Sequence, residues 1–85
     1  MNYKITFKKS ALKELLNFPK IEISRILAQI DLLSIDPRPK GAIKLTGKKD
    51  ALWRIRVGDY RVLYLIEETI KIVEIRAIGH RKDVY

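Results

Sequence analysis

Residues 52–66 read LWRIRVGDYRVLYLI, and this stretch decides the fold. Apolar residues alternate with basic or polar ones on both sides of the pair Gly58-Asp59, which is typical of two antiparallel strands joined by a two-residue turn. Glycine at the first position of that pair favours a type II′ turn. The stretch therefore predicts a β-hairpin with strands at residues 52–57 and 60–66.

The turn also fixes which residues face each other. With Val57 opposite Tyr60, each step back along the first strand matches one step forward along the second. Arg56 therefore lies opposite Arg61, and Arg54 lies opposite Leu63. Because successive side chains in a strand alternate between faces, each face has its own composition. The face suited to a core carries Trp53, Ile55, Val57, Val62 and Tyr64, and the other carries Arg54, Arg56, Arg61 and Leu63.

The segments before the hairpin predict one strand and two helices. Residues 2–8 alternate between apolar and polar, which indicates a half-buried strand. The next two segments, Lys9–Phe18 and Lys20–Ile35, carry leucine and isoleucine at helical spacing, and Pro19 separates them. We expect these two helices to form an antiparallel hairpin, followed by a basic loop through Lys49.

After the hairpin, Glu67-Glu68-Thr69 reverses the chain into a third strand at Ile70–Ile78, and a short basic tail follows at 79–85. The expected fold class is α+β, in the order strand, helix, helix, strand, strand, strand. We expect a single domain over residues 1–85, with the helix hairpin on one face of a mainly antiparallel sheet.

Charge is concentrated around the hairpin. The chain has 18 Lys and Arg against 10 Asp and Glu, a net charge of +8. Between Arg38 and Arg61 there are eight basic residues and two acidic ones, so this segment holds +6 of the total. Such clustering indicates a polyanionic partner, most often nucleic acid. For the pair Lys48-Lys49 alone, a well-solvated surface loop is the favoured explanation of the charge.

Composition excludes several classes of site. Cysteine is absent and His80 is the only histidine, which excludes thiolate chemistry and argues against a metal centre. We expect no cofactor. The sequence shows no long apolar run and no signal-peptide pattern, so we expect a cytoplasmic protein without a membrane partner.

The arginine face is costly unless it binds something. Like charges directly opposite each other destabilise a sheet by up to about 1 kcal/mol. A phosphate site would account for them, because guanidinium groups match phosphate oxygens. Alternatively the arginines splay into solvent or pair with Asp50, Asp59 and Glu74. If the next reversal has an even number of loop residues, we expect Arg76 opposite Arg61 and His80 on the same face.

Such a face could hold RNA or cleave it. Cleavage without metal needs a base for the ribose 2′-OH, cations for the charge on phosphate and an acid for the leaving oxygen. Arginine serves as the cation, and the candidates for proton transfer are His80 first, then Tyr85, Tyr60 and Glu74. Tyr85 could stack on a base, or lie in a frayed terminus.

Three stretches carry a family resemblance: Lys44–Gly47, Leu52–Tyr64 and Ile78–Tyr85. Together they resemble the RelE/ParE superfamily of toxin–antitoxin toxins, and the RelE type more closely. The resemblance implies a metal-independent, ribosome-dependent endoribonuclease that cuts mRNA in the A site and is held inactive by a cognate RelB-like antitoxin.

The resemblance also implies roles for individual residues. Arg54 and Arg56 match two basic positions that are often lysine in the family, Arg61 matches the arginine after the hairpin turn, and Arg81 and Tyr85 match the C-terminal arginine and tyrosine. On this hypothesis the first three contact phosphate, Arg81 meets the leaving group or transition-state charge, His80 transfers protons and Tyr85 stacks on the base. Further RNA contacts are expected from Lys44, Lys48, Lys49, Arg76 and Lys82.

Two departures from the family pattern leave the general base open. Arginine at positions 54 and 56 removes a lysine base, and the sequence ends at Tyr85, where some members continue into a helix. Two other functions stay open as well, a ParE-like gyrase poison of the same fold and a non-catalytic nucleic-acid-binding module. For the toxin readings, we expect an acidic or amphipathic antitoxin segment to cover the basic face.

Overall fold

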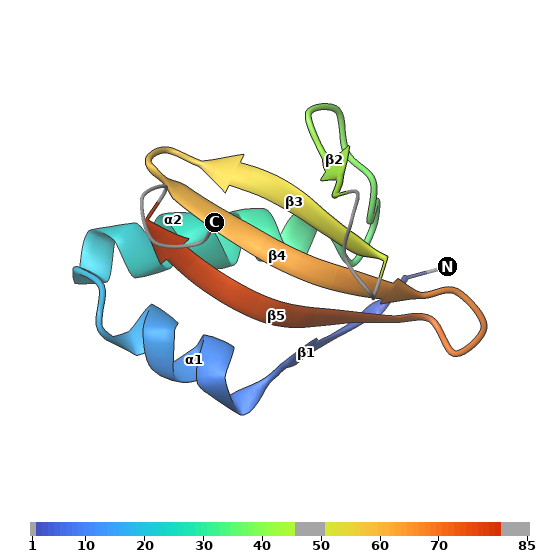
Figure 1. The fold of residues 1–85 in the computed structure, drawn as a ribbon, viewed down its shortest axis with the longest axis horizontal. Coiled ribbons are helices and arrows are strands. Elements are labelled where there is room, and N and C mark those ends of the chain that lie inside the picture. Colours follow the sequence, from blue (N-terminus) through green and yellow to red (C-terminus); the bar gives the residue numbers. More distant parts are fainter. Residues whose placement is uncertain (1, 46–50, 81–85) are drawn as a thin grey trace.

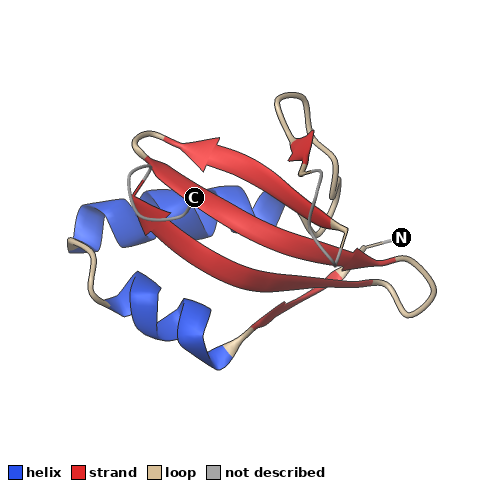
Figure 2. Cartoon of the chain, in the orientation of Figure 1, coloured by secondary structure: helices blue, strands red, loops and turns tan. Residues whose placement is uncertain are grey.

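The structure is a computed structural model that describes residues 2–45 and 51–80. Within these residues the elements are β1 (Lys4–Phe7), α1 (Lys9–Leu16), α2 (Lys20–Leu32), β2 (Ile43–Lys44), β3 (Leu52–Val57), β4 (Tyr60–Glu67) and β5 (Ile72–His80). Figure 1 follows them along the chain, and Figure 2 separates the helices from the sheet. The predicted α+β class and the order of the predicted elements are confirmed.

The described strands form one sheet in the order β1-β5-β4-β3-β2. Strands β3, β4 and β5 make an antiparallel meander, and β1 lies parallel to β5 at one edge. The opposite edge is the two-residue strand β2, which pairs with Trp53 and Arg54 of β3. The sequence prediction placed β2 inside a loop, because two residues are too few to show an alternating pattern.

Both helices cover the same face of the sheet. They run in opposite directions (Figure 1), as the predicted hairpin requires. The core between helices and sheet is built from Ala11, Leu15, Ile26, Ile30, Leu33, Ile55, Val57, Val62, Tyr64, Val73, Ile75 and Ile78. All the apolar residues predicted for this face of the hairpin belong to the core or pack against it. The other face of the sheet carries no helix in the described chain.

Both helices end earlier than predicted. Helix α1 stops at Leu16, because Pro19 restricts the residue before it and the chain turns through Asn17. Helix α2 stops at Leu32, and the backbone then continues to Ile35 in tighter turns, with N–H groups donating to carbonyls three residues back. The apolar residues in those tighter turns keep a helical spacing, which explains why the sequence predicted a longer helix.

Candidate functional site

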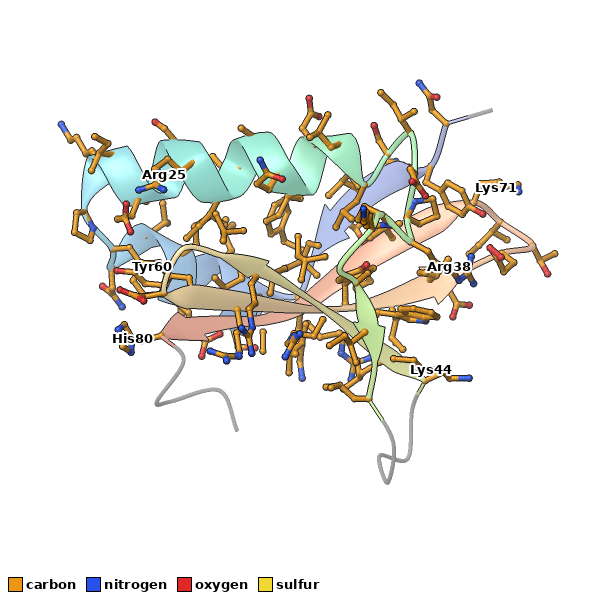
Figure 3. The ribbon with its side chains drawn as sticks, turned by 90° about the horizontal axis from the view of Figure 1, so that it is seen from above. Arg25, Arg38, Lys44, Tyr60, Lys71 and His80 are labelled. Carbon is orange, nitrogen blue, oxygen red and sulfur yellow. The ribbon has the colours of Figure 1, made fainter. Side chains whose placement is uncertain are left out.

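The candidate site is the helix-free face of the β3–β4 hairpin. The observed register pairs Arg56 with Arg61 and Arg54 with Leu63, as predicted. Gly58 has φ +60° and Asp59 has no positive φ, as a type II′ turn requires. Basic side chains project from the sheet on the side away from α2 (Figure 3). The turn and the strand alternation together thus gather three arginines on one surface.

These three arginines differ in burial. Arg54 is only 8% exposed, Arg61 is half-buried and Arg56 is exposed. The Nε atoms of Arg54 and Arg61 are both buried. Arg54 and Arg56 also line a groove between β3 and α2, together with residues such as Leu32 and Ile43. A buried stem restricts the rotamers of a guanidinium group, so less conformational entropy is lost when it binds an anion.

Arg76 does not lie where the sequence predicted. A β-bulge between Leu63 and Tyr64 leaves Arg76 without a place in the β4–β5 register, and Arg61 faces Gly79 instead. The Arg76 Nη1 group donates to Glu74 Oε1 at 3.3 Å. Glu74 itself pairs with Leu65 of β4. The predicted Arg76–Arg61 pair is therefore wrong.

The bulge also changes the position of His80. One extra residue in β5 reverses the facing of every residue beyond it, so His80 pairs with Tyr60 and belongs to the helix side of the sheet. Its ring meets the Tyr60 ring edge-on at a centroid distance of 5.8 Å, and Tyr60 packs on Phe18 at 4.6 Å. Figure 3 shows Tyr60 and His80 at the same end of the sheet. The prediction that His80 shares the arginine face is wrong.

The remaining predicted site residues are separated from this surface or lie outside the described residues. Lys44 pairs with Trp53, so strand alternation assigns it to the opposite side of the sheet from Arg54. The residues outside the described ranges are Lys48, Lys49, Arg81, Lys82 and Tyr85.

Sequence reasoning missed a carboxylate that ties α1 to β5. The backbone N–H of Ile78 donates to Glu14 Oε1 at 3.1 Å, across 64 positions of sequence. Strand β1 pairs with β5 only as far as Ile75, so Glu14 supplies an acceptor where the neighbouring strand has ended. This bond holds β5 two residues before His80. No local signal in the sequence distinguishes Glu14 from the other charged residues of α1.

A second network holds the loop between α2 and β2. Tyr64 donates its hydroxyl to the carbonyl oxygen of Pro37 at 2.7 Å, and burial raises the pKa of Tyr64 to about 12. The Arg38 guanidinium lies 5.2 Å from the centre of the Trp53 ring and donates to Glu68 at 3.3 Å. Tyr3 donates to Glu68 at 2.6 Å, and these hydrogen bonds lower the pKa of the Glu68 carboxyl. The loop is thus fixed beside Arg54.

Among the described residues we find neither a metal-binding cluster nor a membrane-spanning helix. Residues 2–45 and 51–80 contain no cluster of three side chains suited to holding a metal ion. No helix among them is both long and apolar enough to cross a membrane.

Comparison with known proteins identifies the family of this chain. The sequence model described as the ParE toxin of the type II toxin–antitoxin system parDE matches residues 5–85. The chain is 30% identical over 87 residues to the protein named "Putative toxin RelE1" of Methanocaldococcus jannaschii, covering all of this chain and 97% of that protein.

Solved structures agree with the sequence matches. The archaeal RelE–RelB complex of Pyrococcus horikoshii OT3 contains a chain with TM-score 0.83 and 34% identity, covering 99% of this chain and 100% of that one. A chain of the RelBE2 toxin–antitoxin complex of Mycobacterium tuberculosis has TM-score 0.85 at 24% identity, covering 95% and 100%, and so supports the fold alone. The chain therefore belongs to the RelE/ParE superfamily of type II toxin–antitoxin toxins, on its RelE-like side.

Proposed function

We propose that this toxin is a ribosome-dependent endoribonuclease that cleaves mRNA in the A site without a metal ion. One observation carries the proposal: Arg56 and Arg61 face each other across β3 and β4, with Arg54 on the same helix-free face. A face chosen only for stability would avoid opposed cations. An RNA backbone brings phosphate groups that neutralise them. A ribosome-directed enzyme works in the cytoplasm, where we expect this protein to act.

The arginines supply electrostatic stabilisation in this mechanism. Attack of the ribose 2′-OH on the adjacent phosphate places extra negative charge on the phosphate oxygens, and guanidinium groups fixed in advance stabilise that charge. We assign phosphate contact to Arg54, Arg56 and Arg61. The partly buried stems of Arg54 and Arg61 support the assignment, because they limit the motion of both groups.

Proton transfer is proposed for His80. His80 remains a candidate, at the end of β5 beside Tyr60, although its side chain lies on the helix side of the sheet. The family resemblance assigns Arg81 to the leaving group and Tyr85 to base stacking. Outer contacts to RNA are proposed for Lys44, Lys48, Lys49, Arg76 and Lys82. Replacing His80 with alanine tests its role: a proton-transfer group would leave RNA affinity intact and lower the cleavage rate.

The proposed protein partner is a RelB-like antitoxin. Two related structures are named as complexes of a RelE-type toxin with its antitoxin. We propose that an acidic or amphipathic segment of the cognate antitoxin covers the arginine face of this chain, since a net charge of +8 attracts such a segment. Binding should weaken as salt rises and should protect message from cleavage.

The decisive experiment adds the purified protein to a translation reaction and maps the ends of the message. Cuts at a fixed position within ribosome-bound codons are the expected result. The same message without ribosomes is the control. Intact message with tight RNA binding would instead identify a non-catalytic nucleic-acid-binding module.

The second candidate function is a ParE-like gyrase poison, favoured by the family model that matches residues 5–85. A supercoiling assay with purified DNA gyrase separates the two. We expect supercoiling to be unaffected at concentrations that stop translation. Inhibition of supercoiling together with intact message would support the gyrase function.

A further inference from the structure

Gly79 occupies the position opposite Arg61 on the arginine face. It lies inside β5 and is buried. Among the described residues the glycines with positive φ are Gly41 and Gly58, so the backbone at Gly79 has a conformation that any residue adopts. Glycine weakens a strand interior, and where conformation does not require it, it often marks a close approach of another group. Because Gly79 has no side chain, the space beside its register partner is not filled from position 79.

Arg61 is the residue that can use this space. It stands between Arg56 on β3 and Gly79 on β5, since both register pairs are observed. The β-carbons of directly opposed residues are only about 4.5–5.5 Å apart, so a side chain at position 79 would stand beside the Arg61 stem. Repulsion from Arg56 favours a conformation in which the Arg61 guanidinium turns toward β5. The buried Nε of Arg61 agrees with a side chain that lies down on the sheet.

We propose that Gly79 is a positioning residue that lets the Arg61 side chain lie across β5, away from Arg56. The separation leaves room for one phosphate group between the two guanidinium groups, where both can donate to its oxygens. The phosphate part of this inference rests on the proposed function. The position of Arg61 does not, because it follows from the register and from the absent side chain.

The substitution Gly79→Ala tests the position of Arg61 directly. Alanine suits a strand better than glycine, so the melting temperature should equal or exceed that of the wild type. The added methyl group should lift Arg61, and hydrogen exchange of its Nε–H, followed by NMR, should become at least several-fold faster. The matched control is Ala77→Ser on the same face of the same strand, opposite Leu63, which should leave that exchange unchanged.

A double-mutant cycle tests the link to RNA. We expect Gly79→Ala to weaken binding of a short single-stranded oligoribonucleotide at least tenfold, and to have no further effect when Arg61 is already alanine. Additive effects of the two substitutions, an unchanged Nε–H exchange or a lowered melting temperature would each overturn the inference. If the wild type does not cleave message while the exchange still responds to Gly79→Ala, the proposed function fails and the positioning role stands.

Discussion

Arg56 and Arg61 show how single residues reveal function through their unfavourable placement. Two guanidinium groups directly opposed on neighbouring strands repel each other, and Arg54 nearby is 8% exposed. Repulsion of this kind is worth some tenths of a kcal/mol up to about 1 kcal/mol. A chain of 85 residues buries only a small core, so its stability is limited. A repulsive arginine pair in such a chain supports a role in binding anions.

Tyr64 is a residue whose role is structural, and its substitution should show this. Tyr64→Phe removes the hydroxyl that donates to Pro37 and leaves a buried carbonyl without that donor, so we expect a loss of about 1–2 kcal/mol in the free energy of unfolding. Cleavage of message should be retained. Chemical denaturation of both proteins measures the loss.

The raised pKa of Tyr64 adds a pH dependence of definite sign. In the unfolded chain the hydroxyl loses its proton near pH 10, whereas in the folded chain it holds the proton to about pH 12. Its contribution to stability is therefore complete below pH 10 and falls as the pH rises from 10 toward 12. Tyr64→Phe should lose less stability than the wild type over that range. Parallel curves for the two proteins would contradict the assignment.

Glu14 makes a prediction about a single amide. Glu14→Ala removes the acceptor of the Ile78 N–H, whereas Glu14→Gln retains a side-chain carbonyl oxygen that can accept the same bond. Hydrogen exchange of the Ile78 amide should be several-fold faster in the alanine variant and near the wild-type rate in the glutamine variant. Equal exchange in all three proteins would show that the bond does not hold the end of β5.

Among the elements, those with strong periodic patterns could be predicted from the sequence. The 52–66 hairpin, its turn and its register followed from alternation and from Gly58-Asp59. The bulge in β5 could not be predicted, because an extra residue in a ladder is set by packing and not by a turn signal. That single residue explains why Arg76 and His80 were misplaced while Arg54, Arg56 and Arg61 were not.

The sequence predicted the segment that carries β2 only as a basic loop. Contacts between residues far apart in the sequence fix its conformation. Glu68 joins Tyr3 and Arg38, residues 65 and 30 positions away. Propensity scales do not register such contacts, so neither the network nor β2 could be foreseen. The element that borders the arginine face is therefore a product of tertiary structure.

This network predicts an acid dependence. Hydrogen bonds from Tyr3 and Arg38 lower the pKa of Glu68 below its ordinary value of 4.5, so its stabilising contribution is present above that value and is lost as the pH falls through the folded-state pKa. Glu68→Gln should therefore melt below the wild type at pH 7, and the gap should close in acid. Because the groups are exposed, the gap should be small. A gap that persists in strong acid would contradict this cause.

On the scale of the whole molecule, the two faces of the sheet have different roles. The helix-covered face holds the core, and the helix-free face presents arginines that add nothing to that core. A substitution on the second face should therefore change function without changing folding. An equal loss of charge at Lys13, an exposed residue of α1 on the helix-covered side, should change neither.

The most direct test compares Arg61→Ala with Lys13→Ala, an equal loss of charge on α1. Message cleavage in a translation reaction and the melting temperature are measured for both proteins and the wild type. We predict that Arg61→Ala cleaves at least a hundredfold more slowly and melts no lower than the wild type, and that Lys13→Ala matches the wild type in both. Full cleavage by Arg61→Ala, or its failure to fold, would contradict the account.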